Sequence, residues 1–351
     1  MNQAALEHVL RSQQFNPELL RQLFMLADQM EKVWEKGGDR SLLSGCWAVN
    51  LFLQPSTRTH TSFRVGQRML GIETMIDCTD PNVLSLAKAE TIHDTVRTFE
   101  NMVPDPRKLV IVVRHADAQA AEVMAKAARG CKIMNAGCGK SLGQHVTQAI
   151  QDGWTILKHG RRRGLVTLDQ IGEKKGKRRM LHVAMVGDMR NGRTVRSLVY
   201  LLSVAFPWVK LYFYSPPSLT MGRDILQHLD ERGIPWEESS DTQHLYRSLG
   251  KFHVLYDTRF QQEDLGLEDR EQFTDYQQRF QVNARLASRM KEKAIIMHPL
   301  PRNNELTREV DNDPRAAYFD PQIKNGVIVR MALMYFLLKG AQLGQALDHA
   351  A

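Results

Sequence analysis

Apolar runs of strand length alternate with helical patterns through nearly the whole chain, and this alternation constrains the fold more than any other feature. Eight runs have the length of buried strands, at residues 46–52, 73–78, 108–113, 132–136, 181–187, 209–215, 252–257 and 294–298. Helical patterns lie between them, for example at 90–103, 194–205 and 222–233. Strands that alternate with helices predict parallel sheets covered by helices on both faces. We therefore predict an α/β fold of the doubly wound class.

The chain has 351 residues, which is enough for two domains of ordinary size. The eight expected strands divide into two groups of four, on either side of a basic segment. We predict a first domain over residues 1–150 and a second over 151–325, joined by a linking helix at about 144–158. A last apolar helix, within about 326–351, has no strand after it, and we expect it to pack back on the first domain.

The composition is that of a soluble globular protein, with 43% hydrophobic and 25% charged residues. No run approaches the roughly 20 apolar residues that a membrane helix needs. The first residues lack a basic region followed by an apolar core, so we expect no secretory signal and no membrane partner. The cysteines, Cys46, Cys78, Cys131 and Cys138, show no close metal-type pairing. We expect reduced thiols in a cytoplasmic protein.

The net charge of +8 is concentrated in one place. From Lys158 to Arg179 there are nine basic and two acidic residues, which accounts for +7 of the total. Such a local excess weakens the case for nucleic acid as a partner. We interpret the basic segment, about 158–180, as a solvated loop between elements, with a regulatory or polyanion contact as the alternative.

Polar and basic residues follow several of the expected strands directly. They are Ser56–Thr59, Arg114–His115, Arg193, Arg259 and Pro299–Arg302. Ligands of open α/β sheets bind beyond the carboxyl ends of the strands. We therefore predict an active site in an arginine-rich cleft between the two domains, suited to a ligand with phosphate or several carboxylates.

The stretch "STRT" at residues 56–59 has two interpretations. Ser56 or Thr57 is a suitable cap for a helix that runs on through Leu70. The same free N–H groups, together with the Arg58 guanidinium, are also suited to binding an anion. The local sequence leaves both interpretations open.

Motifs along most of the chain, from about residue 45 to about 338, resemble a known family. They are "STRT" (56–59), "VVRH" (112–115), "NAGCGKSLGQHVTQ" (135–148), "VAMVGDMRNGRTVRSL" (183–198), "DTRFQ" (257–261), "HPLPR" (298–302) and "DPRAAYF" (313–319). Their order and spacing are similar to those of the aspartate and ornithine carbamoyltransferases. The last four resemble the aspartate branch, because the ornithine branch normally has a cysteine in place of Pro299.

The resemblance implies transfer of a carbamoyl group from carbamoyl phosphate to the amine of L-aspartate, a step of pyrimidine biosynthesis, with no cofactor and no metal. Such a reaction requires orientation of two substrates and donors aimed at a developing oxyanion. The implied carbamoyl phosphate-binding residues are Ser56, Thr57, Arg58, Thr59, Arg114, His145, Gln148, Leu300 and Pro301. Arg58, Thr59, His145 and Lys88 would be catalytic, and Lys88, Arg193, Arg259 and Gln261 would bind aspartate. The Leu300–Pro301 bond is a candidate cis peptide.

Simpler interpretations exist for several of these residues. Arg114 and Arg193 suit surface ion pairs, and His145 suits a capping or packing role on the linking helix. A dinucleotide-binding oxidoreductase is a poor competitor, because the chain lacks the GxGxxG signature.

The chain departs from the family pattern at several positions. Lys88 aligns with the lysine of a loop that, in the family, enters a neighbouring subunit's site, but Leu84 stands where that loop has a serine and Ser85 lies one residue late. Other departures are Gln54, His60, Ala89, Val146 and Asp264. Because Lys88 would have to reach a neighbouring site, we expect a homotrimer with shared active sites. Regulatory or partner subunits stay an open alternative.

Three functions therefore compete. The first is a working aspartate carbamoyltransferase, in which residues for phosphate and for both aspartate carboxylates are present. The second is a carbamoyltransferase for another amine acceptor, ornithine-like or a different amino acid. The third is a non-catalytic paralogue that acts as a binding or scaffolding subunit.

Overall fold

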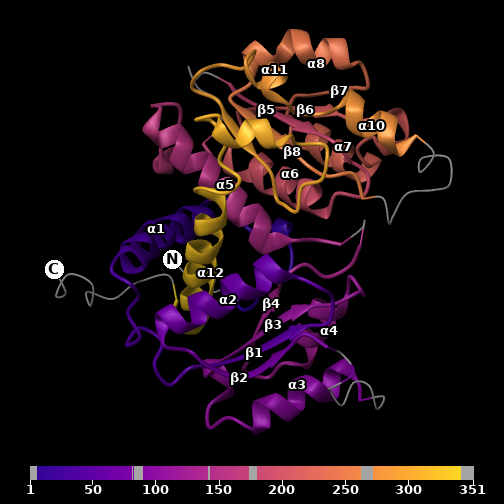
Figure 1. The fold of residues 1–351 in the computed structure, drawn as a ribbon. Helices are drawn as coiled ribbons and strands as arrows, with labels where there is room; N and C mark the ends of the chain where they lie inside the picture. The colour runs from indigo at the N-terminus through magenta and orange to yellow at the C-terminus, as the bar shows by residue number, and fades with distance from the viewer. Residues whose placement is uncertain are drawn as a thin grey trace. The chain divides into compact units, whose positions relative to one another are not determined.

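The computed structural model describes residues 6–80, 82, 90–140, 143–173, 180–261 and 272–340. The chain divides into two compact units. Unit 1 is Met1–Gln151 with Asn325–Ala351, and unit 2 is Asp152–Lys324. The boundary falls inside helix α5 (Val146–Arg162), which is the linking helix (Figure 1).

Unit 1 is built on a four-stranded parallel sheet with the order β2-β1-β3-β4. Its strands are β1 (Trp47–Phe52), β2 (Glu73–Cys78), β3 (Leu109–Arg114) and β4 (Lys132–Asn135). All four had been predicted within a residue of these bounds. The central strands β1 and β3 are buried on both faces, which explains their continuous apolar sequence.

Helices cover both faces of this sheet (Figure 1). On one face, α3 (Ile92–Asn101) and α4 (Ala120–Ala127) contribute Phe99 and Met124 to a core shared with Val49 and Ile111. On the other face, Phe63 of α2 (Thr57–Leu70) packs on Phe52, with ring centroids 6.4 Å apart. The unit also contains α1 (Pro17–Glu35), where Asn16 caps the helix by accepting the Leu19 N–H.

The last helix, α12 (Gln322–Lys339), packs within unit 1 from Asn325 onward. Gly66 of α2 makes room for it, since a Cβ there would lie 3.1 Å from the Met334 side chain and 3.2 Å from that of Met331. Arg330 is buried and donates to Gln151 Oε1 over 3.0 Å, so it ties α12 to α5. No helix among the described residues is long and apolar enough to cross a bilayer.

Unit 2 holds a second parallel sheet, with the order β7-β6-β5-β8-β9. Its strands are β5 (Leu181–Val186), β6 (Val209–Tyr214), β7 (Trp236–Ser239), β8 (Val254–Asp257) and β9 (Ile295–Met297). The predicted fold class is confirmed, but the expected four strands are five. Strand β7 was missed because it is a short edge strand with partly exposed residues and two glutamates, so its sequence has no apolar run.

Helices also cover both faces of the unit 2 sheet (Figure 1). One face carries α6 (Arg193–Ala205) and α7 (Arg223–Glu231). The other carries α8 (Thr242–Ser248), α10 (Phe273–Arg279) and α11 (Ala284–Ala287). These three contribute Leu245, Tyr276 and Leu286 to a core shared with Leu255 and Ile296 of the sheet.

The basic segment is only partly the loop that was predicted. Helix α5 continues to Arg162, so Lys158, Arg161 and Arg162 lie on its last turns. Cations are favourable there because the carbonyl groups at a helix carboxyl end carry partial negative charge. A short 3-10 turn, Leu168–Gln170, follows. Residues 174–179 of the segment lie outside the described residues.

Candidate active-site residues

Each sheet has one point at which the strand order reverses, and the predicted site residues lie at both points. In unit 1 this point is between β1 and β3, and in unit 2 it is between β5 and β8. Such a point leaves a crevice at the carboxyl ends of the strands, where ligands of α/β sheets bind. Ser56–Thr59 follow β1, and Arg114 ends β3. Arg193 follows β5, and Arg259 follows β8.

We call the unit 1 residues the phosphate group of residues. It comprises Ser56, Thr57, Arg58, Thr59, Arg114, His145 and Gln148. The unit 2 residues Arg193, Arg259 and Gln261 are called the carboxylate group of residues.

The amino end of α2 is left open for an anion. Ser56 is the N-cap residue, but its side chain makes no capping hydrogen bond, and the first turn contains no acidic residue. Thr57 is already the first helical residue. The simpler interpretation of a side-chain cap by either residue is therefore wrong. The N–H groups of the first turn and the exposed Arg58 are suited to an anionic ligand.

Thr59 and His145 meet beside this helix end. Thr59 Oγ1 lies 3.3 Å from His145 Nε2, and both side chains are buried. His145 lies one residue before α5, and its carbonyl accepts the N–H of the buried Gln148 over 3.0 Å. The structure thus places His145 and Gln148 at the amino end of the linking helix, next to α2.

The loop after β4 brings Arg114 and His145 close to each other. Gly137 has φ +110°, and a Cβ on it would lie 3.1 Å from Arg114 Nη1 and 3.2 Å from His145 Cδ2. Asn135 Oδ1 fixes the loop by accepting the N–H groups of Gly137 and Cys138, each over 2.8 Å. Asn135 and Gly137 had not been predicted as site residues, although both lie in the quoted motif "NAGCGK".

The carboxylate group of residues is organised by Asp188, another residue that sequence reasoning missed. Asp188 is fully buried and accepts the Asn191 N–H over 2.9 Å, in the turn that leads to Arg193. Its second oxygen accepts the Gln261 N–H over 3.4 Å, so it joins the turns after β5 and β8. Burial raises the pKa of Asp188, and these hydrogen bonds oppose that shift. The available signal in the sequence was an aspartate two residues after an apolar strand.

The ends of β5 and β8 also approach each other closely. Gly187 follows β5 with φ +117°, and a Cβ on it would lie 2.0 Å from the Thr258 carbonyl oxygen. Only glycine fits this position without moving the backbone. The close approach places Arg259, the next residue along, at the point where the strand order reverses.

The Leu300–Pro301 peptide bond is cis, which confirms the prediction. Leu300 has φ +54° and donates its N–H to His298 Nδ1 over 2.8 Å. With Nδ1 accepting, His298 Nε2 carries the proton and donates to Glu305 Oε1 over 3.2 Å. Burial raises the pKa of Glu305, but the hydrogen bonds from His298 and from the Asn303 N–H outweigh it and leave that pKa lowered.

Two departures from the family pattern have local explanations. His60 Nε2 binds Asp77 Oδ1 over 2.6 Å, and its ring packs edge-on against Phe52. Val146 is fully buried as the first residue of α5. Leu84, Ser85, Lys88, Ala89 and Asp264 lie outside the described residues, so the prediction for the Lys88 loop stays a prediction.

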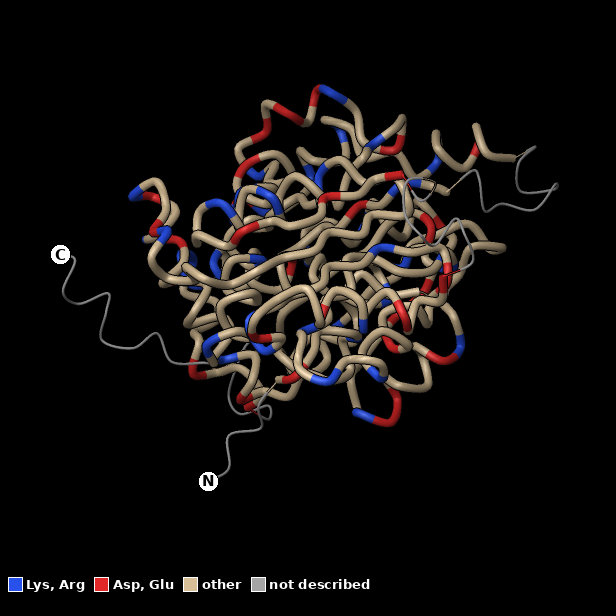
Figure 2. Tube along the Cα trace, turned by 90° about the horizontal axis from the view of Figure 1, so that it is seen from below, with Lys and Arg blue, Asp and Glu red and all other residues tan. Residues whose placement is uncertain are grey.

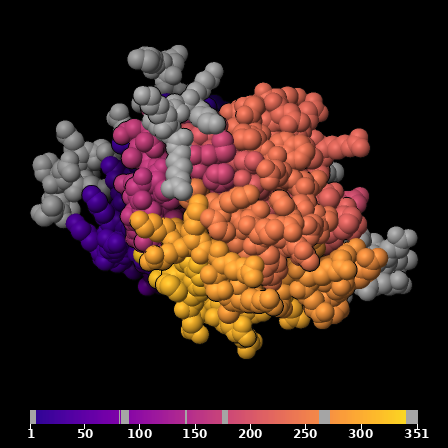
Figure 3. Space-filling view, turned by 90° about the horizontal axis from the view of Figure 1, so that it is seen from above, coloured from indigo at the N-terminus to yellow at the C-terminus, as the bar shows by residue number. Residues whose placement is uncertain are grey.

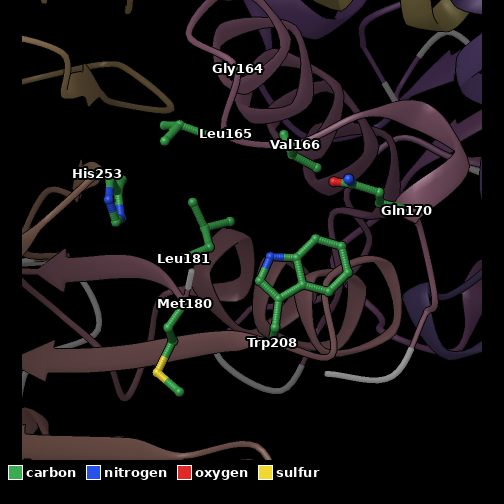
Figure 4. A pocket seen from close by; sticks show the side chains of 8 residues that line it. All are labelled: Gly164, Leu165, Val166, Gln170, Met180, Leu181, Trp208 and His253. Atoms are coloured by element: carbon green, nitrogen blue, oxygen red, sulfur yellow. The ribbon is translucent and has the colours of Figure 1, made fainter. Parts of the chain in front are cut away.

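A cavity of about 340 Å³ in unit 2 is distinct from the carboxylate group of residues (Figure 4). Leu181 begins β5, and Trp208 and His253 precede β6 and β8. The cavity therefore lies at the amino ends of these parallel strands, at the edge of the sheet opposite to Arg193 and Arg259. Its walls are mainly apolar, with Leu181 and Trp208 facing the space in Figure 4.

Two family models match the chain. The aspartate/ornithine carbamoyltransferase carbamoyl-P binding domain matches residues 7–158, and the Asp/Orn binding domain of the same family matches residues 179–337. Together these ranges account for most of the chain.

Curated relatives are aspartate carbamoyltransferases. The chloroplastic aspartate carbamoyltransferase of Arabidopsis thaliana is 41% identical over 335 residues, which cover 95% of this chain and 78% of that protein. The aspartate carbamoyltransferase catalytic subunit of Methanopyrus kandleri is 36% identical over 97% of this chain and 100% of its own length.

Solved structures agree with these relatives. Aspartate transcarbamoylase of Trypanosoma cruzi, in complex with N-(phosphonacetyl)-L-aspartic acid, matches with a TM-score of 0.78 and 30% identity, over 94% of this chain and 95% of that one. The catalytic subunit of M. jannaschii aspartate transcarbamoylase matches with a TM-score of 0.78 and 32% identity, over 95% and 98%.

The two parallel α/β units and the family models together identify a transferase of the carbamoyl-transfer class. The chain belongs to the aspartate/ornithine carbamoyltransferase family. Within that family its curated relatives are of the aspartate branch.

Proposed function

We propose that this protein is an aspartate carbamoyltransferase, which converts carbamoyl phosphate and L-aspartate to N-carbamoyl-L-aspartate and phosphate in pyrimidine biosynthesis. The observation that carries the proposal is the set of side chains at the amino end of α2, which has no side-chain cap. Thr59 contacts His145 there, and Gly137 leaves room for Arg114 beside them. A relative of the same fold binds a phosphonate joined to aspartate, which combines features of both substrates.

The phosphate group of residues has the donors that the carbamoyl phosphate half of the reaction needs. The N–H groups of α2, Arg58 and Arg114 would hold the phosphate through charge-assisted hydrogen bonds. Thr59 and His145 would polarise the carbonyl oxygen on which negative charge develops as the amine attacks. The new C–N bond forms, the C–O bond to phosphate breaks, and phosphate leaves with that electron pair and takes up the proton that the amine loses, so no oxidation state changes.

The carboxylate group of residues suits a substrate with two carboxylates. Arg193 and Arg259 offer planar forks of donors, and Gln261 adds a side-chain amide on a turn whose backbone N–H is held by Asp188. An ornithine side chain would instead bring a second ammonium group toward two guanidinium groups, which is unfavourable. This difference favours aspartate over an ornithine-like acceptor.

The acceptor is tested by comparing carbamoyl transfer to L-aspartate, L-ornithine and other amino acids. We expect kcat/KM to be at least 100-fold higher with aspartate. A preference for another amine would overturn the assignment of the acceptor. Turnover that persists unchanged in a folded Arg58→Ala variant would overturn the assignment of the phosphate group of residues.

We also propose that the enzyme is a cytoplasmic homotrimer with shared active sites. The trimer is supported by the family pattern around Lys88, which enters a neighbouring subunit's site in relatives. The reducing compartment is supported by the cysteines, because all four are free and buried. Light scattering tests the assembly, and a fully active monomer would contradict it.

A further inference from the structure

A cavity of about 330 Å³ lies beside the carboxyl end of α5, wholly within unit 2. Lys158, His159, Arg162 and Arg163 line one side. Arg315 and Asp320, from a segment about 150 residues further on, line the other. We call this space the basic cavity. Figure 3 shows the magenta end of α5 and the orange-yellow stretch near residue 315 on the same face of the unit.

The side chains that line the basic cavity include more cations than carboxylates. Four lining side chains are cationic at neutral pH, whereas Asp320 supplies the one carboxylate among the lining residues. Arg315 is already held by Asp313, with Nη2 and Oδ2 2.6 Å apart. In the described part of the chain, no carboxylate lies within ion-pair distance of Arg162 or Arg163. Elsewhere along the trace, basic and acidic residues are interspersed (Figure 2).

The pKa of His159 indicates that the guanidinium groups of Arg162 and Arg163 both lie near its imidazole ring. Burial lowers the pKa of His159, its hydrogen bond to the Lys293 carbonyl opposes this, and the positive charges of Arg163 and Arg162 lower the pKa further. The same hydrogen bond, 2.8 Å from His159 Nε2 to the Lys293 oxygen, fixes the end of α5 to the segment before β9. The cations therefore lie at a helix end that is fixed to the rest of unit 2.

Compensation of the helix end does not explain the whole arrangement. The partial negative charge at the end of α5 accounts for cations on its last turn. Arg315 comes from a distant segment and lines the same cavity, where Asp313 and the Met290 and Lys291 carbonyls hold its guanidinium in place. Two separate parts of the chain thus place basic side chains around one half-open pocket, in which Arg162 and Arg163 are exposed.

The basic cavity is also separate from the candidate active-site residues of unit 2. Ile295, the first residue of β9, lines it, whereas Leu300 and Pro301 follow the carboxyl end of that strand. Arg193 and Arg259 follow the carboxyl ends of the parallel strands β5 and β8. A ligand in this cavity is therefore not a substrate held by the carboxylate group of residues.

We propose that the basic cavity binds an anion that carries two or more linked phosphate groups. A guanidinium group can donate two parallel hydrogen bonds to two oxygens of one phosphate. Neighbouring arginines therefore favour linked phosphates over carboxylates that lie far apart. A volume of about 330 Å³ equals that of about ten waters at roughly 30 Å³ each, which is more than one phosphate fills. The shared chemistry is a phosphate chain, either inorganic or attached to a nucleoside.

The test is calorimetric titration of the full-length protein with inorganic triphosphate, without substrates. All proteins carry Arg58→Ala, so that the phosphate group of residues does not compete. We compare this background with Arg162→Gln/Arg163→Gln and with a control pair, Arg223→Gln/Arg285→Gln, which removes two exposed charges from the same unit.

We expect one triphosphate per chain, at least tenfold weaker binding in the cavity pair, and a change below twofold in the control pair. Equal weakening in both pairs, no weakening in either, or no binding to the background protein would overturn the proposal. A parallel titration with a nucleoside triphosphate distinguishes the two kinds of ligand. Tighter binding than that of inorganic triphosphate indicates a nucleotide ligand, and equal binding indicates that the phosphate chain alone is recognised.

This result is independent of the proposed activity, because binding is measured without turnover. Arg162 and Arg163 take no part in the proposed reaction. With the natural Arg58 in place, the cavity pair is therefore expected to transfer carbamoyl groups within twofold of the wild-type rate when no polyphosphate is present.

Discussion

Thr59 and His145 come from segments 86 residues apart, and their side chains meet with Oγ1 and Nε2 3.3 Å from each other. Both are buried, so a donor there acts in a medium of low dielectric constant, where its effect on developing charge is large. The contact places His145 beside Thr59, which its position in the sequence leaves open.

Replacing His145 by alanine is expected to lower kcat by about 10²–10³-fold, because loss of one oxyanion donor has that magnitude in other enzymes. Steady-state kinetics measures the effect. His93→Ala, an exposed histidine of the same unit, is the control and should leave kcat within twofold. Equal rates for wild type and His145→Ala would remove His145 from the reaction.

Asp257, just before Thr258 and Arg259, governs a pH dependence of stability. Burial raises the pKa of its carboxyl well above the usual value, and the nearby charge of Glu305 raises it further, against a small opposing effect of the Thr258 N–H. The folded state thus keeps Asp257 protonated, while the unfolded chain ionises it above about pH 4. Stability is therefore lost as pH rises from that value toward the folded-state pKa.

Asp257→Asn removes this loss, because the amide is uncharged in both states. We expect the variant to match wild type near pH 4 and to exceed its free energy of unfolding by a margin that grows as pH rises toward 8. Urea unfolding at several pH values measures this. Asp169→Asn, at an exposed position of the same unit, should show no such trend.

The candidate ligand-binding residues could be proposed from the sequence, whereas the residues that fix the loops around them could not. Arg58, Arg114, Arg193 and Arg259 lie at or beyond the carboxyl ends of strands, so fold class and motif together single them out. Asn135, Asp188 and His298 act through backbone N–H groups of loops. Their partners lie close in the chain, but their importance depends on which loops meet at the sheet edge.

Among the elements, the loop after β4 is sensitive to a single added carbon at Gly137. Gly137→Ala would place a methyl group against both Arg114 and His145, at a φ that L-residues rarely adopt. We expect kcat/KM for carbamoyl phosphate to fall at least tenfold while the protein stays folded. Gly250→Ala is the matched control, because the nearest atom to a Cβ there is 4.0 Å away.

The α12 helix depends on Arg330, a buried cation. Besides its bond to Gln151, it donates to the Gly326 carbonyl over 2.8 Å, and its guanidinium carbon lies 5.4 Å from the centroid of the Phe63 ring. Arg330→Met leaves buried acceptors unpaired and is expected to lower the free energy of unfolding by about 2–4 kcal/mol. Chemical denaturation measures the change. Lys32→Met, on the exposed side of α1, should stay within about 0.5 kcal/mol of wild type.

At the level of the assembled protein, shared sites predict complementation between two inactive variants. Lys88→Ala removes a residue that would act in a neighbouring site, and His145→Ala removes one from its own site. Mixed trimers then contain some sites with both residues intact, so activity should reappear after the two proteins are dissociated and mixed. Mixing either variant with itself is the control, and absence of recovery in the mixture contradicts shared sites.

The sequence by itself determined the fold class, the strands with apolar runs and the family, because burial on both faces and ligand chemistry both demand particular residue types at particular places. It could not reveal β7, whose partly exposed edge position imposes no apolar pattern. The extent of α5 and the basic cavity were decided only in the tertiary structure. The cations near Arg162 read as a solvated run until the folded chain brings Arg315 opposite them, since proximity between distant segments is a property of packing and not of local sequence.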